Sequence, residues 1–181
     1  MNGFISILIP MFLVAAAPQL RAQSPSSQEQ PCPMHASHMA SDDHHASVEN
    51  HGDHAMGFPH DKTTHHFRLT EAGGSIEVTA NDPKDLVNVE AVRMHLAHIT
   101  KAFGGGDYSA PMLVHDVIPP GVTTMQLLKG KIHFQYHAVD SGGRVSIAAD
   151  DPVAQAAIHD FLRFQITDHA TGDSLDIDAG K

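Results

Sequence analysis

Residues 73–83 read GGSIEVTANDP, and residues 142–152 read GGRVSIAADDP. In each stretch a Gly-Gly pair precedes alternating apolar and polar residues, and an Asp-Pro pair follows them. Alternation with a period of two is typical of a half-buried β-strand, and Gly-Gly favours a tight turn. Asp-Pro is typical of a helix start, with Asp as the N-cap and Pro at the first helical position. Each stretch therefore predicts the second strand of a hairpin followed by a helix.

The pattern continues on both sides of these stretches. Upstream, residues 66–69 and 133–136 predict the first strand of each hairpin. Downstream, apolar residues at three- and four-residue spacing predict one helix per stretch. The two apolar stripes are Leu86, Val89, Val92, Leu96, Ile99 and Phe103, and Ile158, Phe161, Leu162 and Ile166. Residues 104–106, three glycines, are expected to end the first helix.

The Gly-Gly and Asp-Pro pairs recur at an offset of 69 residues, which predicts an internal duplication. The repeats cover about residues 65–107 and 131–173 of a folded domain at 58–181. One β-β-α unit cannot bury its apolar face alone, so two units are expected to share a core. The predicted fold class is α+β, with a four-stranded antiparallel sheet and two helices on one face. Chance recurrence of common turn and cap signals is the alternative to duplication.

The first 22 residues predict a signal peptide. Residues 4–17 are almost wholly apolar, and these 14 residues fall short of the roughly 20 that a membrane-spanning helix needs. Such a length is typical of the apolar region of a secretory signal, with cleavage expected near Ala22. We therefore expect a periplasmic or secreted protein without a stable membrane span after cleavage. A retained membrane anchor is the alternative.

Residues 23–57 predict a disordered tail, because no hydrophobic period could order them by burial. The tail and the residues after it are rich in His and Met, with nine His between positions 35 and 66. Thiolate and thioether favour Cu(I), whereas imidazole suits Cu(II), Zn(II) or Ni(II). The candidate metal ligands here are Cys32, Met34, His35, His38, Met39, His44, His45, His51, His54, Met56 and His60. A solvated polar tail is the alternative interpretation.

A second candidate metal site is expected inside the folded domain. When the two helices are aligned at an offset of 66, His95 and His98 stand where the second repeat has Phe161 and Phe164. Met94 is four residues before His98 and therefore lies on the same side of a helix. We expect Met94, His95 and His98 to offer a mixed ligand set, completed by candidates His65, His66 and His115. The alternative is that these imidazoles are hydrogen-bonded packing residues, as we expect for His159.

Two resemblances to known families bear on this sequence. The strings KTTHHF (62–67), GGSIEV (73–78), PPGV (119–122) and IHDFLRFQI (158–166) resemble a bacterial family of small exported proteins that share KTTHHF and IHDFLRFQI. That resemblance implies the folded domain and no activity. Some members carry an aspartate carbamoyltransferase label, which we consider wrong for this chain, because that enzyme needs two large domains and a phosphate-binding Ser-Thr-Arg-Thr loop. The string CPMH (32–35) resembles the short element of heavy-metal-binding modules attached to copper and other metal-efflux proteins.

Composition narrows the function classes. The formal net charge of -10 argues against nucleic-acid binding through a broad basic surface, and a single Cys excludes an intramolecular disulfide. The sequence has no G-x-S-x-G, P-loop or H-E-x-x-H motif, so we do not expect an enzyme. The leading hypothesis is an exported protein that captures or buffers a metal ion, copper first and zinc or nickel as alternatives. The other hypotheses are an interaction module, with a homodimer or periplasmic protein partner, and a small His-ligated metalloenzyme.

Overall fold

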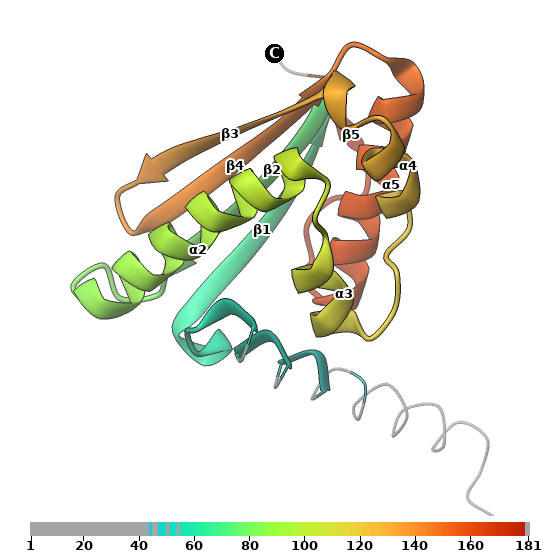
Figure 1. The fold of residues 1–181 in the computed structure, drawn as a ribbon. Coiled ribbons are helices and arrows are strands. Elements are labelled where there is room, and N and C mark those ends of the chain that lie inside the picture. Colours follow the sequence, from blue (N-terminus) through green and yellow to red (C-terminus); the bar gives the residue numbers. More distant parts are fainter. Residues whose placement is uncertain (1–43, 45–46, 50, 54, 180–181) are drawn as a thin grey trace, which may run out of the picture. The chain divides into compact units, whose positions relative to one another are not determined.

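The computed structural model describes residues 44, 47–49, 51–53 and 55–179 (Figure 1). The elements are η1 (His60–Lys62), β1 (Thr63–Thr70), β2 (Gly73–Ala80), α2 (Leu86–Gly105), α3 (Ser109–His115), α4 (Val122–Leu127), η2 (Lys129–Lys131), β3 (Ile132–Val139), β4 (Gly142–Ala149), α5 (Pro152–Asp168) and β5 (Ile177–Asp178). The predicted signal peptide lies outside the described residues. None of the helices described is both long and apolar enough to cross a membrane.

The fold is α+β, as predicted, but its sheet differs from the prediction. It has five strands in the order β3-β4-β2-β1-β5. The first four are antiparallel, whereas β5 runs parallel to β1, with Ile177 opposite Leu69. The four-stranded, wholly antiparallel sheet is therefore wrong. The prediction missed β5 because this strand has only two residues, too few to show an alternating pattern.

The hairpin turns lie two residues before the predicted ones. Thr70 pairs with Gly73 and Val139 with Gly142, so the turns are residues 71–72 and 140–141. The Gly-Gly pairs instead begin β2 and β4, where the helices approach the strands closely. A Cβ on Gly74 would lie 2.4 Å from Leu162 Cδ1 of α5 and 2.1 Å from the Arg68 carbonyl oxygen. Glycine is required at this position by packing.

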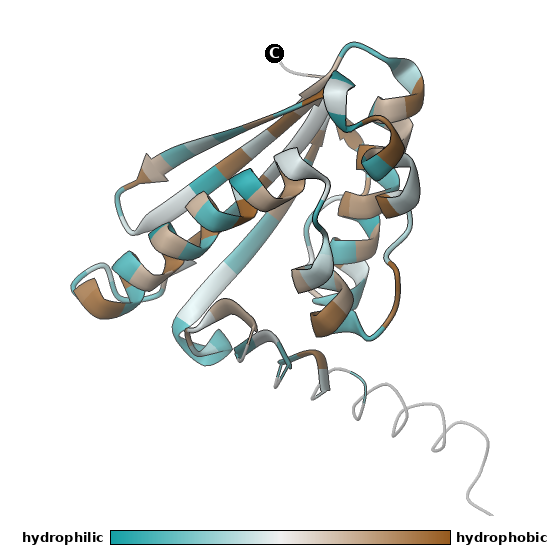
Figure 2. Ribbon diagram, in the orientation of Figure 1, coloured by the Kyte–Doolittle hydropathy of each residue, from teal (hydrophilic) through white to brown (hydrophobic). Residues whose placement is uncertain are grey.

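The two long helices lie on the same side of the sheet (Figure 1). Hydrophobic and hydrophilic residues alternate along the strands (Figure 2), and the inward set packs against both helices. The main members of this core are Phe67, Ile76, Val78, Val145 and Ile147 from the sheet and Val92, Leu96, Phe161 and Leu162 from the helices. The other face of the sheet is polar and open, with an ion pair between Glu77 of β2 and Arg144 of β4.

Helix α5 begins as predicted and α2 does not. The Asp151 carboxylate accepts hydrogen bonds from the backbone N–H groups of Val153 and Ala154 and caps α5. Helix α2 begins at Leu86, and its N-cap is Asp85, three residues after the predicted Asp82. Asp82 accepts from the Lys84 N–H in the preceding turn instead. The first half of the chain thus has a longer connection between strand and helix than the second half.

One arginine joins α2 to the second hairpin. The Arg93 guanidinium donates hydrogen bonds to the carbonyl oxygens of Val139 (2.9 Å), Asp140 (3.1 Å) and Gly142 (3.2 Å). These three carbonyls belong to the turn between β3 and β4 and to its flanking residues. The contact holds this turn against the helix with a group that stays charged at any physiological pH.

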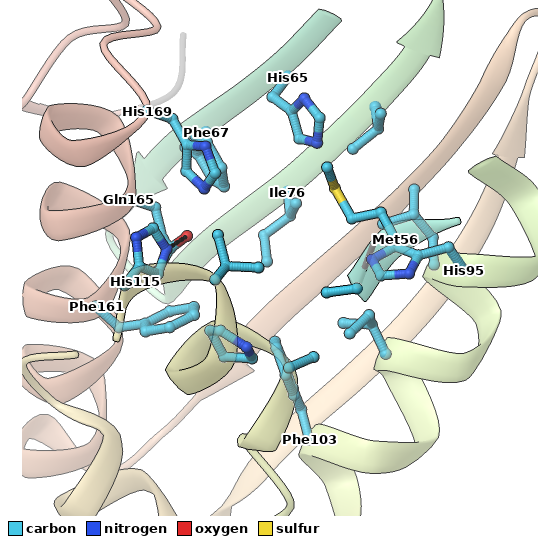
Figure 3. A pocket seen from close by; sticks show the side chains of 17 residues that line it. Met56, His65, Phe67, Ile76, His95, Phe103, His115, Phe161, Gln165 and His169 are labelled. Carbon is cyan, nitrogen blue, oxygen red and sulfur yellow. Dashed lines mark hydrogen bonds between the residues drawn. The ribbon is translucent and has the colours of Figure 1, made fainter. Parts of the chain in front are cut away.

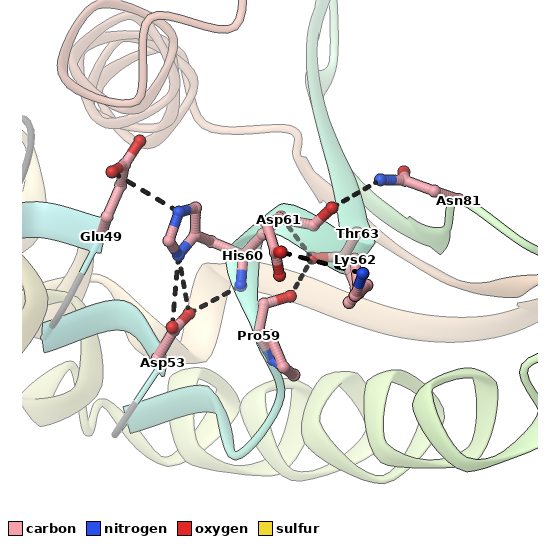
Figure 4. A network of polar contacts seen from close by, with 8 residues as sticks. All are labelled: Glu49, Asp53, Pro59, His60, Asp61, Lys62, Thr63 and Asn81. Atoms are coloured by element: carbon pink, nitrogen blue, oxygen red, sulfur yellow. Dashed lines mark hydrogen bonds and ion pairs between the residues drawn. The ribbon is translucent and has the colours of Figure 1, made fainter.

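The described residues from 44 to 60, called the N-terminal segment below, pack on the domain. Residues 47–49, 51–53 and 55–56 are helical, and Val48 and Phe58 are buried. This differs from a tail that is disordered up to residue 57. His60 links the helical part to β1, because its Nδ1 lies 3.1 Å from Asp53 Oδ1 and its Nε2 lies 3.5 Å from Glu49 Oε2 (Figure 4).

Candidate functional site

A cavity of about 70 Å³ lies between the sheet and the helices. The N-terminal segment, β1, β2, α2, α3 and α5 each contribute side chains to its wall (Figure 3). Most of the wall is apolar, formed by core residues such as Ile76, Phe103 and Phe161. The members that carry nitrogen, oxygen or sulfur in their side chains are His65, His95, His115, His169, Gln165 and Met56. The cavity is therefore an apolar space with several imidazoles around it, an arrangement suited to a binding site.

The four histidines follow one another along the cavity. The His95 ring centroid lies 5.6 Å from that of Phe58, which lies 6.4 Å from that of His65. The His65 ring stacks on His169 at 5.7 Å, and His169 meets His115 edge-on at 4.9 Å. We call His95, His65, His169 and His115 the histidine row. It brings together residues that are up to 104 positions apart in the sequence.

Two members of the row hold neutral imidazoles. Burial, together with the nearby His95, His66 and His60, lowers the pKa of His65 to about 4. Burial and the neighbouring His98 lower the pKa of His95 to about 4 as well. No hydrogen bond joins either ring to another described residue. At neutral pH each ring therefore has an unprotonated nitrogen available as a ligand.

His115 differs because both of its nitrogens are engaged. This buried residue donates from Nδ1 to the Asp168 carboxylate, and its Nε2 lies 3.0 Å from Gln165 Oε1. Asp168 also accepts from His44 Nε2 at 2.8 Å. Burial opposes ionisation of Asp168, but the contacts with His44 and His115 outweigh it and lower the pKa of the carboxyl group. His115 thus holds Gln165 and Asp168 in place at the cavity wall, and neither of its nitrogens is free to bind a metal ion.

The structure separates other predicted ligands from the cavity. His66 points to the open face of the sheet, where its Nδ1 lies 2.9 Å from Asp173 Oδ1. On α2, Met94 is 61% exposed and His98 is also exposed, whereas His95 faces the cavity. The expected set of Met94, His95 and His98 therefore does not converge on one point. His159 donates from Nε2 to the Thr70 carbonyl (2.8 Å), in agreement with a structural role.

A second, more polar pocket adjoins the cavity. Glu49, His60, Thr63 and Thr171 line it, and it shares Met56, His65 and His169 with the cavity. His51 is half-buried in the N-terminal segment, and its Nδ1 has no hydrogen-bond partner among the described residues. The remaining predicted ligands, Cys32, Met34, His35, His38, Met39, His45 and His54, lie outside the described residues.

In the part of the chain that the structure describes, no three His, Cys, Asp or Glu side chains are grouped so that they could hold a metal ion. The candidate ligand set at the cavity is therefore two imidazoles and one thioether, from His65, His95 and Met56. In Figure 3 the Met56 side chain lies between the rings of His65 and His95. All three were expected as ligands, but in different groups.

His169, Gln165 and Asp168 were not predicted from the sequence. A signal for the first two exists, because α2 and α5 have N-caps that are 66 residues apart. At this offset His169 corresponds to Phe103 and Gln165 to Ile99, both buried apolar residues. A polar residue at a position where the matching helix is apolar indicates a polar environment in the core. No comparable signal marks Asp168.

Comparison with protein-family models, with curated proteins and with solved structures gave no match for this chain. Its function is therefore inferred from the cavity and the side chains around it.

Proposed function

We propose that this protein binds a soft transition-metal ion, copper first and zinc or nickel as alternatives, as an exported metal-capture or buffering protein. The observation that carries the proposal is that two unprotonated imidazoles and one thioether line the same apolar cavity. Thioether and imidazole together favour Cu(I), and an apolar surrounding keeps hard, hydrated ions out. His65, His95 and Met56 are the proposed ligands in the folded domain.

The lowered pKa values matter for this chemistry because protons compete with metal ions for imidazole nitrogen. At pH 5 an ordinary histidine of pKa 6.5 is only about 3% unprotonated, whereas one of pKa 4 is about 90% unprotonated. His65 and His95, with pKa values of about 4, therefore stay available as ligands in mildly acidic conditions. The cavity should hold its ion at a pH where exposed histidines release theirs.

The tail is proposed to supply a first, acid-sensitive set of ligands. Its members outside the described residues are Cys32, Met34, His35, His38, Met39, His45 and His54. Of the candidate ligands in the N-terminal segment, His44 contacts Asp168 and His60 contacts Glu49 and Asp53. Carboxylate contacts of this kind also fix the orientation of metal-bound imidazoles, so they do not argue against a ligand role.

We also propose that the domain arose by duplication of a β-β-α unit. The bounds of β1 and β3 differ by 69 residues, as do those of β2 and β4, and the two helix caps differ by 66. In this alignment His65 corresponds to Phe134, His95 to Phe161, and His169 to Phe103. Three members of the histidine row thus stand where the other half has an aromatic side chain. This pattern supports a binding role, because packing alone is satisfied by phenylalanine.

The test is a Cu(I) titration of the full chain under reducing conditions, in competition with a chromophoric chelator, at pH 7 and pH 5. Met56→Leu and His95→Gln are expected to weaken the site that persists at pH 5 at least tenfold. Met94→Leu and His98→Gln are matched controls, because they make the same changes on the exposed side of α2. Equal loss in the controls, or no copper bound at pH 5, would contradict the cavity site.

A second candidate function is protein interaction or self-association. Leu113, Val117 and Ile118, at the end of α3 and just after it, are 61%, 51% and 60% exposed. Neighbouring exposed apolar side chains are typical of an interaction surface. Light scattering over a range of protein concentrations, with and without copper, tests self-association. If the protein is monomeric in both conditions, self-association through this surface is excluded and the partner must be a different protein.

A further inference from the structure

Strand β3 forms one edge of the sheet, and no other described strand pairs with its outer side. It stands at the end of the strand order β3-β4-β2-β1-β5 and has eight residues. The opposite edge is closed in part, because β5 pairs with the end of β1 there. Proteins usually protect an edge strand with Lys, Pro or an inward-pointing charge, but residues 132–139 (IHFQYHAV) contain no Lys, Arg, Asp, Glu or Pro. The β3 edge is therefore open to pairing with another strand.

Two histidines of β3 have no role in the cavity. His133 and His137 are exposed, and neither forms a hydrogen bond or ion pair with another described residue. Phe134 packs against the core on the inner face, so the alternation of side chains places both histidines on the open face. Four residues along a strand span roughly 13 Å, which is too far for two imidazoles to bind the same metal ion. Within one chain, His133 and His137 therefore cannot form a metal site together.

The backbone of β3 can pair with a second copy of the same strand. Residues 140–141 form a two-residue turn, and the pair that closes such a turn, Val139 and Gly142, bonds within the hairpin. Every second residue before Val139 therefore directs its backbone groups toward β4. The even-numbered residues, 132, 134, 136 and 138, direct theirs outward. An antiparallel pair of β3 strands centred on Gln135 brings these outward groups of the two copies opposite one another.

Aromatic and charged side chains favour this pairing. On the inner face Phe134 then lies opposite the partner's Tyr136, and aromatic cross-strand pairs stabilise a sheet. Both residues are only half-buried in the single chain, where they pack against the core. At the ends of the strand the exposed Lys131, which also contacts Asp151 of its own chain, lies beside the partner's Asp140. The two ends of β3 thus carry opposite charges that an antiparallel partner brings together.

We propose that two copies of this protein pair through β3, and that each His133, together with the partner's His137, binds a divalent transition-metal ion on the open face. Residues directly opposite each other on paired strands have Cβ atoms about 4.5–5.5 Å apart, so two imidazoles can reach one ion. The two-fold symmetry of the pair creates two such sites, and each is incomplete in a single copy. Imidazole suits Zn(II), Ni(II) and Cu(II), and water completes the coordination. No residue of the cavity takes part, so failure of this proposal would leave the cavity site standing.

The first test is analytical ultracentrifugation of the full chain with Zn(II) and with EDTA. Zn(II) is expected to strengthen dimerisation roughly tenfold or more, because an ion that binds only the dimer shifts the equilibrium toward it. His133→Gln removes one ligand from both sites of the dimer and is expected to abolish the effect of Zn(II). His66→Gln is the matched control, since it makes the same change on the open face of β1, and it should keep the effect. A chain that stays monomeric with Zn(II), or a Zn(II) effect that His133→Gln does not reduce more than His66→Gln, would overturn the proposal.

A cross-link tests the pairing of the strands. Gln135→Cys, in a chain that also carries Cys32→Ser, places a thiol where the two copies meet. In the proposed pairing the two Cα atoms at this position are about 4.5 Å apart, within the range that a disulfide spans. Oxidised glutathione in the presence of Zn(II) is therefore expected to give a disulfide-linked dimer on a non-reducing gel. Ser146→Cys, on the neighbouring strand β4 and opposite Gln135, is the matched control and should stay monomeric on the gel. Equal cross-linking at the two positions, or none at Gln135→Cys, would overturn the proposal.

Discussion

His65 and His66 are adjacent in β1, yet they meet opposite surroundings. Successive side chains of a strand point to opposite faces of the sheet, so His65 enters the cavity and His66 lies on the open face. His65 has a pKa lowered to about 4 and no hydrogen bond to another described residue, whereas His66 pairs with Asp173. A His-His pair in a strand therefore cannot supply two ligands to one ion, and the face decides the chemistry of each ring.

The largest expected difference between the two faces concerns stability. Gly74→Ala places a methyl group on the inner face, 2.1 Å from the Arg68 carbonyl oxygen and 2.4 Å from Leu162 Cδ1. Because a backbone oxygen cannot move aside cheaply, we expect a loss of about 3 kcal/mol in the free energy of unfolding. Ser75→Ala, the next residue and on the outer face, is expected to cost less than about 0.5 kcal/mol. Urea denaturation measures both, and similar losses would refute the distinction between the faces.

The second largest expected effect is a pH dependence of the free energy of unfolding, caused by the histidine on the inner face of the sheet. In the unfolded chain His65 takes up a proton below about pH 6.5, whereas in the folded protein it does so only near pH 4. Acid therefore favours unfolding between these values, on the order of 2 kcal/mol between pH 7 and pH 5 for this residue. His95 adds a similar contribution. Urea denaturation at the two pH values measures the total.

Variants assign this pH dependence to its source. His65→Phe introduces the residue that the second half of the domain has at the corresponding position, Phe134. This variant should reduce the stability difference between pH 7 and pH 5 by about 2 kcal/mol. His66→Gln should leave most of that difference in place. If the two variants changed it equally, the inner-face assignment would be wrong.

The smallest effect is expected on the open face. The Asp173 carboxylate accepts from His66 Nδ1, from the Phe67 N–H and from the Thr171 hydroxyl. Burial opposes its ionisation, but these contacts lower the pKa of Asp173 below its usual value. Its charge therefore stabilises the fold at neutral pH, and that contribution is lost only in strong acid. His66→Gln removes one partly exposed contact, so we expect a loss below about 1 kcal/mol by urea denaturation and no change in Cu(I) affinity.

Local sequence patterns predicted the hairpins and the α5 cap. Alternation and helical stripes depend on residues close together in the chain, so they are visible without the fold. The Gly-Gly pairs led to a wrong prediction of the turns. These glycines are required by close contacts with Leu162, a distant residue of α5, and with Tyr136 on the neighbouring strand β3. Helix α3 was missed because its seven residues contain a proline and show no complete stripe.

The candidate site was predicted residue by residue more successfully than as a group. His65, His95 and Met56 were all candidates from their chemistry alone. Their grouping depends on which side of a strand or helix each one faces and on where α2 packs. His115 was expected as a ligand, but its partner Asp168 lies 53 residues further along the chain. A long-range contact of this kind leaves no trace in local spacing.

The arginine that joins α2 to the second hairpin has a consequence for the order of assembly during synthesis. Arg93 leaves the ribosome about 50 residues before the last of its acceptor carbonyls, at Gly142. The strand β2 likewise lacks one of its neighbours in the sheet until β4 has been synthesised. The early half of a nascent chain thus carries a cationic docking point and an open strand edge that the later half completes. Translation pauses between residues 106 and 131 would prolong exposure of both, and with it the interval in which chaperones are needed.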